Sequence, residues 1–209
     1  MLKFENVSKQ FSKQFILSNF SFEIHQGDKV NISGRSGIGK TTIFRLILGF
    51  EEPDTGTIYF NQKPLTNKTV WDIRKQIAYV SQDLSIGNGK VSALFNSTLS
   101  LKENLKNKIA STNEIKPLMA FFNLPEALLQ KSIDELSGGE KQRVALINAL
   151  LLKRKIFLLD EFTSALDKAL KEKVFNYFFQ NKEFTVIYIS HDDFLPQNVE
   201  LKTIELEKP

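Results

Sequence analysis

The segment Gly34-Arg35-Ser36-Gly37-Ile38-Gly39-Lys40-Thr41 matches the pattern G-x-x-x-x-G-K-[ST]. Glycines in this pattern let the backbone curl, so that successive amide groups point inward at phosphate oxygens. Lys40 is expected to contact the β- and γ-phosphates and is therefore a candidate catalytic residue. The Thr41 hydroxyl is expected to coordinate Mg²⁺. The segment, extended to Thr42, therefore predicts a phosphate-binding loop for a nucleoside triphosphate.

The residues on either side of this loop support that interpretation. Lys29–Ser33 has the composition of a short strand, and a helix is predicted after the loop. Helical spacing places four apolar residues on one face of that helix, with Gly49 near its end: Ile43, Leu46, Ile47 and Phe50. A glycine-rich turn that matches by chance is the alternative, but the strand and helix are the context that phosphate binding requires.

The base of the nucleotide is predicted from a missing motif. GTPases read guanine with an Asn-Lys-x-Asp sequence. The nearest string here, Asn67-Lys68-Thr69-Val70, lacks the aspartate and lies in the wrong part of the chain. Adenine is therefore the expected base, and ATP the expected nucleotide.

Two adjacent carboxylates end an apolar segment, Ile156-Phe157-Leu158-Leu159-Asp160-Glu161. A buried strand would deliver Asp160 to the carboxyl edge of a parallel sheet, beside the phosphate-binding loop, where it can hold Mg²⁺ through water. Glu161 points elsewhere because successive side chains alternate on an extended chain, and it is placed to polarise an attacking water. The alternative is an acidic strand end that merely leads into a loop. The phosphate-binding loop earlier in the chain makes this alternative less favourable.

A second glycine motif, Leu136-Ser137-Gly138-Gly139-Glu140, precedes a strongly helical segment. Ser137 with Glu140 three residues later is typical of a capping box, which would make this an ordinary helix start. A helix N-terminus with a hydroxyl is also an anion-binding site. Both interpretations can hold together, and spacing does not decide between them.

Strands that alternate with helices predict an α/β fold with a mostly parallel sheet covered by helices, as in P-loop NTPases. An N-terminal antiparallel β region is expected from the alternating segments around Phe4 and Phe22. Residues 83–135, with helix-like stretches bounded by Asn113, Pro117 and Pro125, predict an inserted helical subdomain. We expect a single domain over 1–209, in which 1–82 and 136–209 form the ATP-binding core and a last strand spans Thr203–Leu206.

Bulk composition is that of a water-soluble domain. The 209 residues are 42% hydrophobic and 25% charged, and 28 basic against 24 acidic residues give a mild net charge of +4. This charge favours a mixed solvated surface over the alternative, attraction to an anionic membrane face or to nucleic acid, and no nucleic-acid partner is expected. Disulfides and thiolate metal sites are excluded because the chain has no cysteine, which agrees with a cytoplasmic protein. We expect neither a signal peptide nor a membrane-spanning segment, because no apolar stretch is long enough.

The motifs together resemble the ATP-binding cassette (ABC) family. Leu136–Glu140 is similar to the family's signature sequence, and the other landmarks follow the family order from Leu2 to His191. These landmarks are an aromatic residue for adenine at Phe11, a Q-loop glutamine at Gln82, a D-loop at Ser164-Ala165-Leu166-Asp167, and a switch histidine in Ser190-His191-Asp192. Phe15, four residues after Phe11, competes with it for the adenine.

This resemblance implies two copies that face head to tail around two ATP molecules. Each ATP would lie between Lys40 and Thr41 of one copy and Ser137–Gly139 of the other. Gln82 would contact Mg²⁺ and sense a transmembrane partner, and Asp167 would link the two sites. His191 would bind the γ-phosphate and help to hold the water that Glu161 orients, which makes both of them catalytic.

The sequence departs from the family pattern at two positions. Phe162 follows Glu161 where the family usually has proline, so a less rigid entry to the D-loop is expected. Asn148 stands on the signature helix where many relatives carry arginine. Neither change removes a phosphate, metal or water contact.

The function that the resemblance implies is an ATPase that drives transport through separate permease subunits, at the inner face of the cell membrane. It would pair with itself or with a similar ATPase subunit. The rival hypotheses are an ATPase of DNA repair, chromosome maintenance or ribosome function, and an accessory ATPase of cofactor assembly. Repair and ribosome ATPases usually carry long coiled-coil insertions, zinc-binding cysteines or two cassettes. This sequence shows none of these features, which favours transport. Cargo and direction are not encoded in these motifs.

Overall fold

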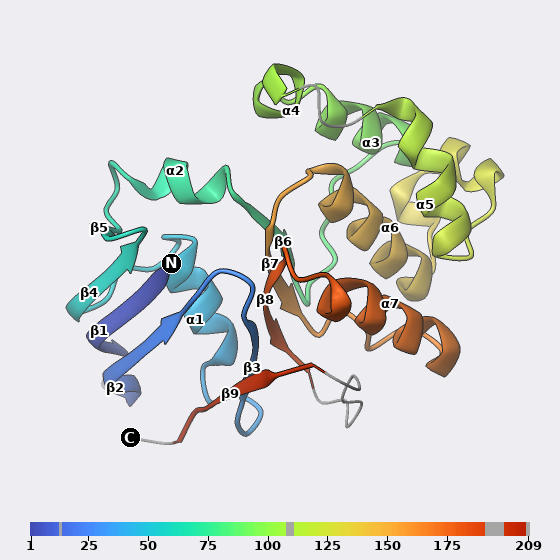
Figure 1. The fold of residues 1–209 in the computed structure, drawn as a ribbon. Coiled ribbons are helices and arrows are strands. Elements are labelled where there is room, and N and C mark those ends of the chain that lie inside the picture. Colours follow the sequence, from blue (N-terminus) through green and yellow to red (C-terminus); the bar gives the residue numbers. More distant parts are fainter. Residues whose placement is uncertain (13, 108–110, 191–198, 208–209) are drawn as a thin grey trace.

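The computed structural model describes residues 1–12, 14–107, 111–190 and 199–207. Within these ranges the chain forms two β-sheets and a set of helices, arranged as one antiparallel sheet, one parallel sheet and a helical side (Figure 1). The α/β fold with a mostly parallel sheet and an N-terminal antiparallel region is confirmed.

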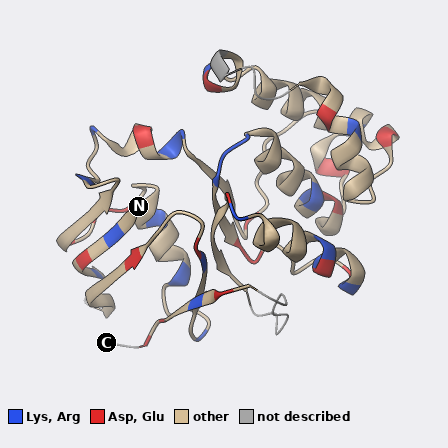
Figure 2. Ribbon diagram, viewed as in Figure 1, with Lys and Arg blue, Asp and Glu red and all other residues tan. Residues whose placement is uncertain are grey.

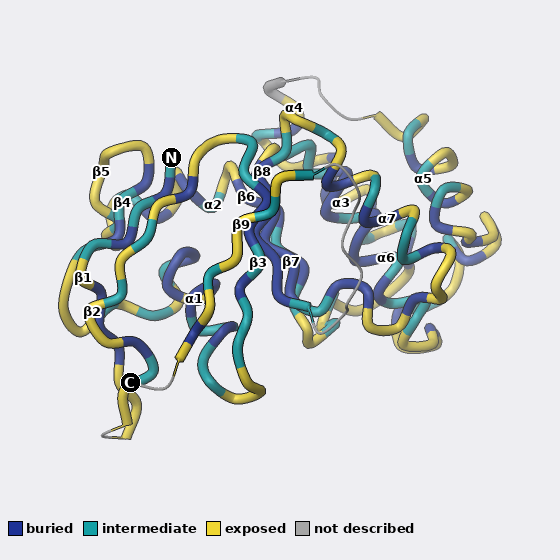
Figure 3. Tube along the Cα trace, turned by 60° about the horizontal axis from the view of Figure 1, so that its bottom comes forward, coloured by how far each residue is buried: buried dark blue, intermediate teal, exposed yellow. Residues whose placement is uncertain are grey.

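The parallel sheet carries five strands in the order β6-β7-β8-β3-β9. Their bounds are β3 Lys29–Ser33, β6 Ile77–Val80, β7 Ile156–Asp160, β8 Thr185–Ile189 and β9 Leu201–Glu205. Every residue of β7 and β8 is buried, as the dark central strands of Figure 3 show. Apolar side chains dominate both strands because a central parallel strand is covered on both of its faces.

Alternate residues of these strands face two different hydrophobic cores. Leu158 and Ile187 pack in a core with α1 (Lys40–Ile47), which lies between the two sheets (Figure 1). Phe157 and Tyr188 pack in the other core, with α6 (Gly138–Leu151) and α7 (Lys168–Gln180). Because β3, β6, β7 and β8 run parallel to one another, their carboxyl ends meet at one edge of the sheet.

The antiparallel sheet has the strand order β2-β1-β4-β5. Its strands are β1 Leu2–Phe11, β2 Gln14–Ile24, β4 Thr55–Phe60 and β5 Lys63–Pro64. Phe4 on β1 is fully buried and stacks on Phe22 of β2, with their ring centroids 4.4 Å apart. The sheet covers α1 and brings the β1–β2 hairpin towards the phosphate-binding loop.

The described part of residues 83–135 contains three α-helices, on the side away from the antiparallel sheet (Figure 1). They are α3 Val91–Leu99, α4 Lys102–Asn107 and α5 Ile115–Phe121, followed by 3-10 turns at Glu126–Gln130 and Ile133–Glu135. Phe95 and Met119 are fully buried in the same core as Leu146 of α6. This region therefore shares its core with α6, and the division of the chain at residues 82 and 136 stays a prediction.

Three local predictions were wrong. Phe50 lies beyond α1 and is 55% exposed, because the chain turns at Gly49 with a φ of +62°. Pro117 lies inside α5, at its third position, because a residue in the first helical turn needs no backbone N–H. The last strand begins at Leu201, two residues before the predicted start, and α2 (Val70–Arg74) was not predicted at all.

Candidate nucleotide-binding site

The phosphate-binding loop connects β3 to α1, at the carboxyl edge of the parallel sheet. Gly37 and Gly39 have φ angles of +75° and +112°, which side chains with a Cβ rarely adopt. A Cβ on Gly39 would lie 2.0 Å from the Cγ2 atom of Ile16. Glycine is therefore required at position 39 for two reasons: the backbone conformation and the close approach of β2.

Lys40 is the first residue of α1 and is only 8% exposed. Its ammonium donates hydrogen bonds to the carbonyl oxygens of Gly34, at 2.9 Å, and Arg35, at 3.1 Å. The loop's own backbone thus holds the charge beside the curled amides. An anion bound by those amides would meet a positioned cation.

Thr41 and Asp160 come together although they are 119 residues apart in the sequence. The Thr41 hydroxyl donates to the Asp160 Oδ2 atom over 2.9 Å, and Asp160 is 1% exposed. Burial raises the pKa of the Asp160 carboxyl and the neighbouring Glu161 adds to this, while Thr41 and Lys40 act in the opposite direction. A buried carboxylate beside a hydroxyl is a fitting donor set for a hard divalent cation, which would stabilise the ionised form.

Glu161 adopts a left-handed backbone conformation with a φ of +47°. This conformation costs a residue with a Cβ roughly 1–2 kcal/mol. Hydrogen bonds hold the strained backbone: the Glu161 N–H donates to the Ile189 carbonyl at 2.9 Å, and the Ser164 hydroxyl donates to the Glu161 carbonyl at 3.0 Å. The surrounding structure thus fixes a residue that would otherwise relax, as is common at functional sites.

Phe162 follows Glu161 and is fully buried. Its ring packs against Phe175 at 5.1 Å, Phe178 at 6.1 Å and Tyr188 at 6.4 Å between centroids. The aromatic core thus anchors this position, and the less rigid loop entry expected from the missing proline stays a prediction. Asn148, the other departure, accepts a 2.6 Å hydrogen bond from the Thr98 hydroxyl and so ties α6 to α3.

The second glycine motif forms the N-terminus of α6. Ser137 is the N-cap, and the capping box with Glu140 is confirmed: the Glu140 N–H donates to the Ser137 hydroxyl at 3.3 Å, and the Ser137 N–H donates to Glu140 at 2.8 Å. That backbone donor lowers the pKa of the Glu140 carboxyl. Ser137 and Gly138 are exposed, and a Cβ on Gly138 would meet nothing within 4 Å. The helix start is accessible to a ligand.

The remaining predicted site residues lie in different settings. Gln82 is exposed and follows the carboxyl end of β6, at the same sheet edge as Asp160. Asp167 caps α7, where its Oδ1 atom accepts a hydrogen bond from the Leu170 N–H at 3.0 Å. His191 lies outside the described residues.

A cavity of about 600 Å³ adjoins the phosphate-binding loop. It is lined by Phe15 and Ile16 of β2, by residues 34–38 and by residues 205–207. Phe11 does not line it; that ring is 40% exposed, with the Lys9 ammonium 5.1 Å from its centroid. Of the two aromatic candidates for adenine, only Phe15 faces this cavity.

Sequence reasoning missed the role of Gln142 in α6. Its side chain is 3% exposed and hydrogen bonds to the loop that follows Glu161. The sequence shows only a polar residue, separated by Arg143 from the apolar run Val144–Leu146, and a surface glutamine would look the same.

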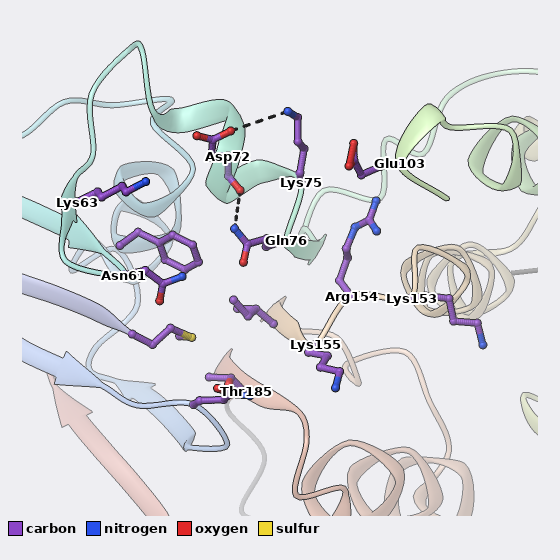
Figure 4. A pocket seen from close by; sticks show the side chains of 14 residues that line it. Asn61, Lys63, Asp72, Lys75, Gln76, Glu103, Lys153, Arg154, Lys155 and Thr185 are labelled. Atoms are coloured by element: carbon purple, nitrogen blue, oxygen red, sulfur yellow. Dashed lines mark hydrogen bonds and ion pairs between the residues drawn. The ribbon is translucent and has the colours of Figure 1, made fainter. Parts of the chain in front are cut away.

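A larger cavity, of about 690 Å³, lies at the opposite edge of the sheet, where β7 and β8 begin (Figure 4). Its walls include Asp72, Lys75 and Gln76 from the region of α2, and Glu103 of α4. The connection from α6 to β7, residues 153–155, adds a continuous basic run (Figure 2). This cavity is separate from the phosphate-binding loop.

A parallel sheet with a phosphate-binding loop after β3 and a hydroxyl–carboxylate pair at its carboxyl edge defines a P-loop nucleoside triphosphatase. The family model described as ABC transporter matches residues 17–164. The chain belongs to the ABC transporter family, as an ATP-binding and ATP-hydrolysing cassette.

Individual relatives agree with this assignment. The chain is 35% identical to the ergothioneine transport ATP-binding protein of Helicobacter pylori (strain G27), over 97% of this chain and 95% of that protein. It is 38% identical to the molybdate/tungstate import ATP-binding protein of Methanocaldococcus jannaschii, over 92% of this chain but only 63% of that protein. Its fold matches a dimeric ATP-binding cassette in a post-hydrolysis state with ADP and Pi, at a TM-score of 0.83 and 26% identity, over 100% of this chain and 97% of that chain.

None of the helices in the described part of the chain combines the length and apolar character needed to cross a membrane.

Proposed function

We propose that this ATPase powers a separate membrane-spanning permease, from a peripheral position at the inner face of the cell membrane. The relatives named for transport and import support the class of process. The observation that carries the catalytic part is the 2.9 Å contact between Thr41 and Asp160, which joins the phosphate-binding loop to the carboxylate strand.

In each chain the triphosphate would bind over residues 34–42. Lys40 would contact the β- and γ-phosphates, because its ammonium already lies against the loop backbone. Thr41, Asp160 and Gln82 would hold Mg²⁺, which supplies positive charge that neutralises the phosphate oxygens.

Glu161 would act as the general base. Its carboxylate would accept a proton from a water, whose oxygen attacks the γ-phosphorus while the bond to the ADP oxygen breaks, giving ADP and phosphate. His191 would bind the γ-phosphate, as the family resemblance implies. The strained backbone of Glu161 supports this assignment, because the fold maintains it at a cost.

Two copies would enclose two ATP molecules, with Ser137–Gly139 of one copy completing the site on the other. The exposed, capped N-terminus of α6 supports this arrangement, since a helix start attracts phosphate oxygens. Asp167 would lie at the contact between the copies. The partner copy thus supplies part of each active site.

Gly138→Ala separates the folding role of this glycine from its role at the dimer contact. We expect the free energy of unfolding to stay within about 1 kcal/mol of wild type, because the added Cβ meets nothing and alanine is the better helix former. ATP turnover should fall about 10-fold or more, because the methyl group enters a space that the partner's nucleotide needs. Chemical unfolding and steady-state phosphate release measure the two quantities; wild-type turnover would contradict the shared site.

The adenine ring is expected to stack on Phe15. Phe15→Ala should weaken ATP binding about fivefold, since such a stacking contact is worth roughly 1 kcal/mol. Phe11→Ala, four residues away on the same hairpin, is the matched control and should change the affinity less. Titration calorimetry with ATP tests both variants. A larger loss of ATP affinity from Phe11→Ala would instead support Phe11 as the residue that stacks on adenine, as the family resemblance implies.

We infer that residues 83–135 form an inserted helical subdomain that docks on the permease together with α2. Exposed apolar side chains support this: Trp71 of α2 is 62% exposed, and Leu105 of α4 is 61% exposed. Between these elements lies the charged cavity of Figure 4, which includes Lys75 and Arg154. An amphipathic segment of the permease, with apolar and acidic side chains, would match these features.

Docking can be tested in solubilised membranes of the source cell. The tagged wild-type chain should copurify with a polytopic membrane protein. Leu105→Asp should reduce the recovered membrane partner about 10-fold, because one lost leucine contact is worth roughly 1.5–3 kcal/mol. Gln180→Asp, which introduces the same side chain at the exposed last residue of α7, is the control and should leave the recovery unchanged. Copurification with DNA or ribosomes in place of a membrane protein would favour the rival functions.

A further inference from the structure

The side chain of Gln142 joins the second glycine motif to the catalytic carboxylate segment of the same chain. Gln142 lies in the second turn of α6, five residues after the Ser137 cap, and is 3% exposed. Its Nε2 atom donates to the Glu161 carbonyl at 2.9 Å and to the Ser164 hydroxyl at 3.2 Å. Its Oε1 atom accepts from the Ala165 N–H at 2.9 Å. Both ends of the amide are therefore used.

These contacts concentrate on the Glu161 carbonyl. The Ser164 hydroxyl also donates to this oxygen, at 3.0 Å, and the Ser164 N–H at 3.2 Å. Glu161 is the residue with the strained φ of +47°, so its backbone needs external bonds to keep its conformation. The Gln142 amide comes from a different element, α6, and is thus a connection between that helix and the base.

Backbone packing also brings the start of α6 into contact with the loop that follows Glu161. A Cβ on Gly139 would lie 3.0 Å from the Ala165 carbonyl oxygen, so the start of α6 rests directly on the loop of residues 161–167. Any shift of this helix start would move the loop or break the Gln142 bonds.

We propose that Gln142 is a positioning residue that couples the second glycine motif to Glu161. This inference rests on the proposed dimer, in which Ser137–Gly139 contact the partner's ATP while Glu161 acts on the chain's own ATP. Through Gln142, engagement of the partner's nucleotide sets the position of the base at the other site. Each chain thereby links the two ATP sites.

Gln142→Met tests this role, because it keeps the shape of the side chain and removes all three hydrogen bonds. ATP affinity and KM should stay within about twofold of wild type, while kcat falls about 10- to 100-fold, as expected for lost hydrogen bonds that orient the base. The Hill coefficient for ATP should fall towards 1. Thr98→Val is the matched control: it breaks the partly buried hydrogen bond that the Thr98 hydroxyl of α3 donates to Asn148 of α6, and it should leave kcat unchanged.

A double-mutant cycle with Glu161→Gln separates positioning from general destabilisation. In the Glu161→Gln background, Gln142→Met should produce no further fall in the single-turnover rate, because the base on which it acts is gone. An additive fall, or a wild-type kcat in Gln142→Met alone, would overturn the inference. Rapid turnover by Glu161→Gln itself would instead overturn the proposed base, so the two failures are distinguishable.

Ser164→Ala covers the case in which Gln142→Met does not fold. Ser164 is exposed, and its hydroxyl bonds to both the Gln142 amide and the Glu161 carbonyl. We expect kcat to fall about three- to tenfold with an unchanged KM. A wild-type kcat in this variant would contradict the inference as well.

Discussion

Glu161→Gln is expected to bind ATP with the wild-type affinity and to lower turnover by at least about 10³-fold. The amide has the size of the carboxylate but does not accept the proton of the attacking water. A loss of this size corresponds to about 4 kcal/mol of barrier lowering. The variant should also accumulate as an ATP-bound dimer, because hydrolysis no longer separates the copies. Phosphate release and analytical ultracentrifugation with ATP measure the two effects.

Glu183→Gln is the matched control for this experiment. Glu183 is exposed and pairs with Lys155 over 3.1 Å at the edge of the sheet away from the phosphate-binding loop. The same chemical change there should leave turnover and the oligomeric state unchanged. Multiple rapid turnovers by Glu161→Gln would show that another group activates the water.

Lys40→Ala is expected to weaken ATP binding about 100-fold or more. Hydrogen bonds from a charged donor are worth roughly 1.5–3 kcal/mol, and the ammonium is positioned to reach two phosphates. The change also removes the bonds that tie the side chain to the Gly34 and Arg35 carbonyls, so the loop loses an internal contact. Titration calorimetry measures the affinity, and unfolding in urea measures the stability.

Lys68→Ala provides the comparison, because Lys68 is an exposed lysine in the loop before α2. It makes the same change in net charge and should leave the ATP affinity unchanged. An affinity within about twofold of wild type for Lys40→Ala would contradict the placement of the phosphates over this loop.

Strongly patterned segments of the fold were predictable from the sequence. The apolar strand that ends at Asp160 and the loop before α1 follow from composition and turn chemistry, which act locally. Phe50 and Pro117 were misjudged because helix ends depend on competing local bonds: the chain turns at Gly49, and a first-turn proline loses nothing. α2 spans only five residues, too few for a periodic pattern.

The placement of candidate site residues was predictable where each belongs to a local motif, as with Lys40, Thr41 and Asp160. Gln142 escaped because its role depends on a loop about 20 residues later in the chain, and no pattern marks a buried amide. The burial of Phe162 escaped for the same reason, since its aromatic neighbours come from α7 and β8. Phe11 and Phe15 lie in neighbouring register positions on the paired strands β1 and β2, and no pattern in the sequence showed which of the two rings lines the cavity.

The claim that two copies enclose each ATP can be tested by cross-linking, because the chain has no cysteine of its own. One tagged chain would carry Ser36→Cys in the phosphate-binding loop, and a differently tagged chain would carry Ser137→Cys, both in the Glu161→Gln background. A short bis-maleimide should join unlike chains when Mg²⁺ and ATP are present, and neither chain should cross-link when it is alone. Equal cross-linking without ATP, or none between unlike chains with ATP, would contradict the shared site.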